Sequence, residues 1–360
     1  MPIDNELESL EKQLQETDDF NETPPSDIVA FNELRSCADL LRMYETGQLN
    51  IQPDFQRDVV WSGPMQTRFV DSLVKQLPIP SMCISLDYKT QERLVIDGLQ
   101  RISSILFFLS EKKEWKLSKL EDIDPKISGK TNLYIRKKYS GIIDKVENTT
   151  IPITVLRCDY TKKNHMAYLF TIFHRLNTGG NKLTNQEIRN CIYSGPFNET
   201  LRNLVVFDNF RKLFSLEEDK SYRFAYEELI LRFFAFSELF ENYRGRLAKF
   251  LNEYMEDNRL MAESQRSDLE QKFKDIVNLI YFKICDQQSL PKISKATSEA
   301  LFVGISRNFD NLQNENEAQL QERFNNLMND QLFSVDSLKG GLSSNEGVQA
   351  RMNRSIEIFS

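Results

Sequence analysis

A strand-to-helix junction at residues 97–101, Asp-Gly-Leu-Gln-Arg, constrains the fold of this chain more than any other feature. The β-branched run 94–96 precedes it, and an apolar pattern with helical spacing follows it at 102–109. The five residues combine a carboxylate, a glycine, the amides of a helix N-terminus and a guanidinium, which are the groups of a phosphate site. Asp97 and Gln100 also fit a helix capping box. Taken alone, the junction favours the cap.

The remaining pattern predicts a mixed fold. Three strands are expected in the first half of the chain, at 82–86, 93–96 and 151–156. Besides the helix that follows the junction, helices are expected at 31–50, 65–77 and 167–176. Residues 111–150 are polar and lysine-rich, so we expect limited order there. From residue 197 onward nearly every segment has helical spacing, and the run 233–236 is expected in the core. The predicted fold class is α+β, with a small mixed-sheet unit followed by a larger α-helical unit.

The net charge of −7 resides at the N-terminus. Residues 1–30 contain nine acidic side chains and one basic one, so the rest of the chain is close to neutral. We therefore expect an acidic flexible tail at 1–30, a sheet-containing ligand-binding domain at 31–215 and an α-helical domain at 216–360. A neutral body neither indicates nor excludes a nucleic-acid partner.

Several function classes are disfavoured by what the sequence lacks. It has no apolar run long enough for a membrane span, no signal-peptide pattern and no C-x-x-C pair among its five cysteines, so we expect a cytoplasmic protein with no membrane partner. The two histidines, His165 and His174, stand outside any metal-ligand motif. P-loop and G-x-G-x-x-G motifs are absent, so any nucleotide must bind through another architecture.

Three polar segments remain as candidate binding loops: Gln56-Arg57, the junction 97–101, and 175–180 with its Asn-Thr-Gly-Gly turn. Each combines an arginine with amide side chains or glycines, which is what an anionic ligand requires if the loops converge. Each also has an ordinary interpretation. Gln56-Arg57 fits a surface loop, and the third segment fits a helix C-cap followed by a turn.

Taken in order, the motifs resemble a known family. They are Phe55-Gln56-Arg57 with Trp61, Asp71-Ser72-Leu73 with Pro78-Ile79-Pro80, Val95 to Arg101, and Phe173 to Gly180 followed by Thr184 and Glu187-Ile188-Arg189. This order is similar to the N-terminal domain of GmrSD-type restriction endonucleases (domain of unknown function 262), whose core is similar to the ParB/sulfiredoxin fold. The resemblance covers residues 31–240.

The resemblance implies a module that binds and hydrolyses a nucleoside triphosphate (GTP, ATP or CTP) in bacterial defence against phage. The family signature is written DGQQR, and Leu99 takes the place of its first glutamine. That change favours the alternative of a non-catalytic nucleotide or DNA sensor or scaffold. A second alternative is a ParB-like DNA nuclease. Residues 240–360 lack an HNH-like pattern, so DNA cleavage is expected on a partner protein of the defence system, and a homo-oligomer is a further expected assembly.

The expected site follows from these motifs. Asp97 is the candidate ligand for Mg²⁺ or for the attacking water. The catalytic group is Asp97, Gln100, Arg101 and Arg57, with Arg57 as a second cation. The nucleotide-binding residues are Gln56, Arg57, Gly98, Gln100, Arg101, Arg175, Asn177, Thr178 and Gly179.

Overall fold

The computed structural model describes residues 7, 9–11, 13, 23–51, 61–176, 183–217, 222 and 224–360. The chain forms two compact units: Asn21–Leu183 is the first, and Thr184–Ser360 together with the N-terminal residues is the second. The units divide between residues 183 and 184, whereas the sequence pattern placed a boundary between 215 and 216. No helix in the described ranges is both long enough and apolar enough to cross a membrane.

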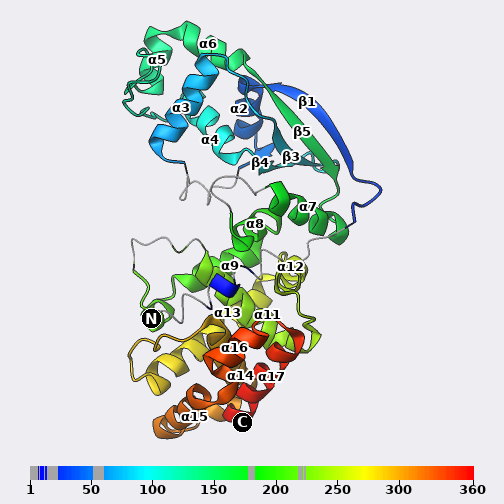
Figure 1. The fold of residues 1–360 in the computed structure, drawn as a ribbon, viewed down its shortest axis with the longest axis vertical. Helices are drawn as coiled ribbons and strands as arrows, with labels where there is room; N and C mark the ends of the chain where they lie inside the picture. Colours follow the sequence, from blue (N-terminus) through cyan, green and yellow to red (C-terminus); the bar gives the residue numbers. More distant parts are fainter. Residues whose placement is uncertain are drawn as a thin grey trace. The chain divides into compact units, whose positions relative to one another are not determined.

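A five-stranded mixed sheet forms the base of the first unit (Figure 1). Its strand order is β1-β5-β3-β4-β2. The strands are β1 (Val29–Ser36), β2 (Leu49–Asn50), β3 (Met82–Asp87), β4 (Arg93–Asp97) and β5 (Thr150–Cys158). The pairs β1–β5 and β3–β4 are antiparallel, and the pairs β3–β5 and β2–β4 are parallel. This sheet, with the helices around it, confirms the α+β class.

The described part of the same unit also contains six α-helices. They are α2 (Cys37–Glu45), α3 (Gly63–Val74), α4 (Leu99–Leu109), α5 (Asn132–Lys138), α6 (Ser140–Asn148) and α7 (Lys163–Leu176). One apolar core joins helices α2 to α6 with strands β2 to β5, and its fully buried members include Leu40, Val70, Ile84 and Ile105. Helix α7 contacts β4, the strand that ends at Asp97.

The helix predicted from residue 31 is wrong in its first part, because 29–36 form the edge strand β1 and only 37–45 are helical. The error has a physical cause. Val29, Phe31 and Leu34 are exposed, so the strand lacks the alternating buried side chains that identify β-structure.

Residues 111–150 are ordered, contrary to expectation. Leu117, Ile123 and Ile127 are buried in the core. Two side chains of helix α3 also hold the segment by hydrogen bonds. Thr67 Oγ1 accepts from the amide of residue 118 at 2.9 Å, and Asp71 Oδ1 accepts from the amide of residue 124 at 2.9 Å. The apolar residues are spread irregularly among lysines, so periodicity could not reveal that they pack.

The second unit is helical. It comprises α8 (Asn185–Ile192), α9 (Pro196–Val205), α10 (Asp208–Leu213), α11 (Ala225–Leu239), α12 (Leu247–Asn258), α13 (Glu263–Asn278), α14 (Lys295–Leu312), α15 (Glu317–Asn329), α16 (Val335–Gly341) and α17 (Asn345–Phe359). Helix α11 is buried over most of its length, and Phe233, Phe234 and Phe236 lie in the core as predicted. The predicted Thr184–Glu187 capping box at α8 is confirmed.

Two described residues of the acidic N-terminal segment are buried in this unit. Leu7 is 5% exposed and packs with Ala296 and Leu338, and Glu11 is ion-paired to Arg232 on α11. These residues differ from the flexible tail expected at 1–30. The difference arises because their partners lie more than two hundred residues away in the chain, where local spacing carries no information about them.

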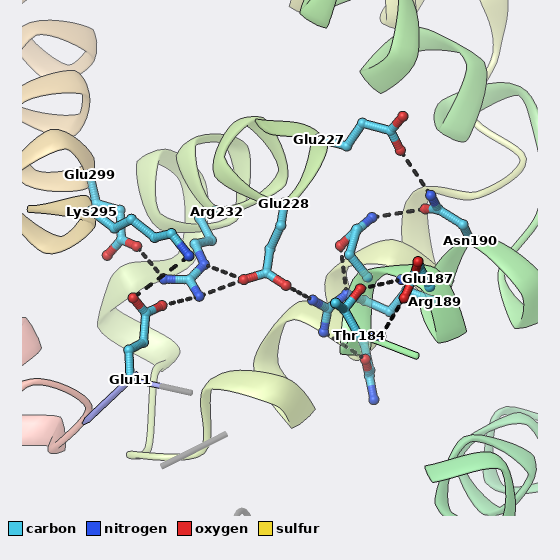
Figure 2. A network of polar contacts seen from close by, with 12 residues as sticks. Glu11, Thr184, Glu187, Arg189, Asn190, Glu227, Glu228, Arg232, Lys295 and Glu299 are labelled. Carbon is cyan, nitrogen blue, oxygen red and sulfur yellow. Dashed lines mark hydrogen bonds and ion pairs between the residues drawn. The ribbon is translucent and has the colours of Figure 1, made fainter. Parts of the chain in front are cut away.

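Glu11 belongs to a network of buried charges that links α8, α11 and α14 (Figure 2). Glu228 lies between two arginines, with its Oε2 2.6 Å from Arg189 Nη2 and its Oε1 2.6 Å from Arg232 Nη2. Arg232 Nη1 also donates to Glu299 at 2.6 Å. Burial alone would raise the pKa of Glu228, but the charges of Arg232 and Arg189 outweigh it and lower that pKa to about 2. Each buried charge in this group therefore has an opposite charge beside it.

Candidate functional site

Gly98 determines how β4 turns into α4. It has φ 96° and ψ 13°, in the left-handed region that glycine adopts without strain. A Cβ at this position would lie 2.7 Å from Met82 Cγ on the neighbouring strand β3. The junction therefore needs glycine for two separate reasons, its backbone angle and its close packing.

The capping box predicted for Asp97 and Gln100 is wrong. The residue that caps α4 is Gly98, so the first-turn amides have no side-chain cap. Asp97 Oδ2 instead accepts a hydrogen bond from Arg101 Nη2 at 2.7 Å. The Asp97 carboxylate therefore pairs with the guanidinium of Arg101, one helical turn later in the chain. It does not cap α4, so another acceptor can bind at the positive end of the helix dipole.

Arg101 connects three parts of the chain. Besides Asp97, its Nη1 donates to the backbone oxygens of Pro80 at 2.7 Å and Ser81 at 3.3 Å, just before β3. Its side chain is 14% exposed, whereas that of Asp97 is 42% exposed. The arginine therefore braces the loop beside the junction and also places a positive charge at the start of α4.

Gln100 faces a different neighbour. Its Oε1 accepts from the backbone N–H of Trp61 at 3.4 Å, a long hydrogen bond between α4 and the residue just before α3. Gly98, Gln100 and Arg101, like Asp97, are neither fully buried nor fully exposed. Asp97, Gly98, Gln100 and Arg101 are thus each partly accessible.

The other predicted site residues are placed only in part. Gln56, Arg57, Asn177, Thr178 and Gly179 lie outside the described residues. Arg175 is described, and it lies exposed in the last turn of α7, the helix that contacts β4. The predicted segment 175–180 therefore begins at the end of α7, a helix that contacts β4, the strand before the junction.

The metal prediction rests on Asp97 alone. Within the described ranges, no group of three potential metal-binding side chains comes together. Mg²⁺ is commonly held by one or two carboxylates, waters and the phosphates of the substrate itself, so a single half-exposed carboxylate is compatible with that mode. Asp97 Oδ2 is already engaged with Arg101, which leaves Oδ1 as the oxygen that would face an ion.

Sequence reasoning missed one residue that shapes the unit. Asn132 is 1% exposed, and its Nδ2 lies within hydrogen-bonding distance of the backbone oxygens of Phe107, Ser110 and Lys113. Its Oδ1 accepts from the N–H of Trp115 at 2.8 Å. The one available signal was Thr131 before an apolar helical turn, which is a capping pattern.

The fold and the junction define a class: an α+β domain with a glycine-led helix start and an arginine–carboxylate pair at the end of a strand. Residues 37–194 match the family model described as GmrSD restriction endonuclease, N-terminal domain. The resemblance predicted from the motifs is therefore confirmed over residues 37–194, and the match suggests a component of a restriction-type defence system. No curated protein and no solved structure was found to match the chain.

Proposed function

We propose that the GmrSD-type domain binds a nucleoside triphosphate at the β4–α4 junction and hydrolyses it, and that any DNA cleavage lies on a partner chain. The observation that carries the proposal is the start of α4. There a left-handed Gly98 leaves the first-turn amides without a side-chain cap, beside a fixed arginine.

The chemistry follows from those groups. The amides at the start of α4 would donate hydrogen bonds to phosphate oxygens, and the helix dipole favours the negative charge of those oxygens. A guanidinium has five N–H donors, and the hydrogen bonds of Arg101 to Asp97, Pro80 and Ser81 do not use them all. Arg101 would therefore stabilise charge on the transferred phosphate without leaving its position.

Asp97 would have a separate role. Its carboxylate is 42% exposed at the end of β4, where it would hold a Mg²⁺ ion or orient the attacking water. Such an ion would neutralise negative charge on the phosphates. Gln100, anchored to the backbone of Trp61, would position that water or a phosphate oxygen.

A non-catalytic nucleotide sensor is the second candidate, and Leu99 is the observation that favours it. Leu99 is half-buried and packs against the apolar core, at the position where the related signature has a glutamine. It therefore adds no polar group to the junction. Binding without turnover is the expected behaviour if that glutamine takes part in hydrolysis.

Calorimetric titration with GTP, ATP and CTP, paired with a phosphate-release assay, separates the two candidates. We expect binding of at least one triphosphate, and loss of phosphate release in Asp97→Asn, a variant of nearly the same shape. If wild type binds a triphosphate without releasing phosphate and Leu99→Gln gains phosphate release, the natural protein is the sensor. Binding that is absent from wild type for all three triphosphates would overturn the proposal.

A further inference from the structure

We infer that a cavity in the sheet unit binds a nucleobase, with the attached phosphate facing two lysines at its rim. The cavity has a volume of about 690 Å³ and is bounded by α2, the start of α3, the second half of α4 and residues 112–115. Its size lies in the range of small-molecule sites. None of the described residues predicted for the triphosphate site lines it.

The walls of the cavity are aromatic. Trp61, Trp115, Phe107 and Tyr44 all line it. The Phe107 and Trp115 rings are 6.0 Å apart and tilted by 43°, so they form one angled wall. Flat aromatic surfaces of this kind stack well against planar heterocycles, and every nucleobase offers such a face.

Gln66 supplies a hydrogen-bond donor without a partner. It lines the cavity and is 6% exposed, and its Nε2 has no hydrogen-bond partner in the part of the chain that the structure describes. A buried donor left unpaired costs stability, so such groups in folded proteins call for an explanation. A ring nitrogen or carbonyl oxygen of a ligand would accept from it.

Positive charge is placed at the rim. Lys112 and Lys113 line the cavity and are exposed, and Lys112 Nζ lies 3.0 Å from Glu45 Oε1. An exposed ion pair of this kind contributes little to stability, so Lys112 can exchange its carboxylate for a ligand phosphate at small cost. A ligand with an anionic group outside its ring would therefore be favoured.

The aromatic wall is held rigidly. The side-chain amide of Asn132 fixes the backbone at Phe107, Ser110, Lys113 and Trp115, which all line the cavity. A site preorganised in this way loses little freedom when a ligand binds.

A planar ring, a hydrogen-bond acceptor and an anionic group occur together in a nucleotide. Two sources share that chemistry: a free mononucleotide and an unpaired base of a DNA strand. No described residue of the β4–α4 junction lines the cavity, so the inference holds whether or not the junction hydrolyses a triphosphate.

Tryptophan fluorescence of the full chain tests this site directly, because the sequence contains two tryptophans and both line the cavity. Trp61 also contacts Gln100, so Trp61→Phe is used to leave Trp115 as the single reporter. The probes are AMP, GMP and CMP, a short single-stranded DNA, and inorganic phosphate. We expect saturable quenching by mononucleotides or by the DNA strand, which identifies the source, and none by phosphate.

Two further variants decide whether the signal comes from this cavity. Gln66→Leu keeps the approximate size of the side chain. It should raise the ligand concentration at the quenching midpoint about tenfold without lowering the melting temperature of the free protein. Asp97→Asn, at the junction, should leave the midpoint unchanged. Absence of saturable quenching with every base-containing probe, equal affinity in Gln66→Leu, or loss of the signal in Asp97→Asn would each overturn the inference.

Discussion

The same pair of chemical groups, an arginine and a carboxylate, is used in two opposite ways in this molecule. At the β4–α4 junction, Arg101 and Asp97 are 14% and 42% exposed. In the helical unit, Arg232 and Glu228 are 3% and 9% exposed, and both have additional charged partners. A half-exposed pair can share its charges with an incoming anion, whereas a buried pair cannot lose a partner without a large penalty. On this comparison we propose ligand binding for the first pair and a stabilising role for the second.

The largest expected effect tests the buried pair. Arg232→Met removes the charge shared by Glu228, Glu299 and Glu11 and leaves three carboxylates buried together. We expect the free energy of unfolding to fall by about 3–5 kcal/mol, the usual result of breaking a buried ion pair. Urea denaturation measures this loss.

Arg307→Met is the matched control, since Arg307 pairs with Glu241 on the surface of the same unit at 3.1 Å. Its expected cost is below about 1 kcal/mol. Equal losses in the two variants would contradict the distinction between buried and exposed pairs.

Asn132→Ala has the next largest effect and extends the comparison to a neutral buried group. The change leaves the Trp115 amide and three backbone oxygens without their partner. A loss of about 2–3 kcal/mol is expected from unsatisfied buried polar groups. Asn132→Asp keeps the oxygen that accepts from Trp115 but removes the N–H donors, and thermal melting measures its stability. A melting temperature equal to that of wild type would argue against the role of the side-chain N–H groups.

Arg101→Ala should separate stability from binding. We expect about 1–2 kcal/mol of lost stability, since three partly exposed hydrogen bonds disappear, and a loss of triphosphate affinity of at least about tenfold. Urea melts and calorimetry on the same preparation measure both quantities. A stability loss as large as that of Arg232→Met, with affinity unchanged, would make Arg101 a purely structural residue.

The last prediction concerns the pH dependence of stability. The pKa of Glu228 is about 2 in the folded chain, against an ordinary value of 4.5. A carboxyl group with a lowered pKa stabilises the fold above its unfolded pKa, and that contribution is lost as pH falls toward the folded value. The stability advantage of wild type over Glu228→Gln should therefore be constant above pH 5 and shrink between about pH 4.5 and 2. An advantage that grows on acidification would contradict the assignment.

The two regions also differ in how far sequence could predict them. The strands before and after the junction, Gly98 as the point of the turn and the family itself follow from local residues, because period, glycine and motif order are local signals. The orientation of Asp97 could not be predicted, because a capping box and an i,i+4 ion pair with Arg101 use the same residue.

The buried network could not be predicted at all. Glu11, Glu228 and Glu299 come from segments far apart in the chain, and each has the appearance of an exposed acid on a helix. Only tertiary packing brings them around Arg232. The same holds for Gln66 and Trp115, which meet at one cavity although neither belongs to a polar motif.

Hydrogen exchange of the backbone amides tests the central proposal most directly. The amides of Leu99, Gln100 and Arg101 begin α4 without a side-chain cap, so a bound phosphate would accept from them and slow their exchange. The account predicts that a saturating triphosphate protects these three amides and leaves those of α11 unchanged. Protection elsewhere in the chain, with the first turn of α4 unaffected while the triphosphate is bound, would contradict it.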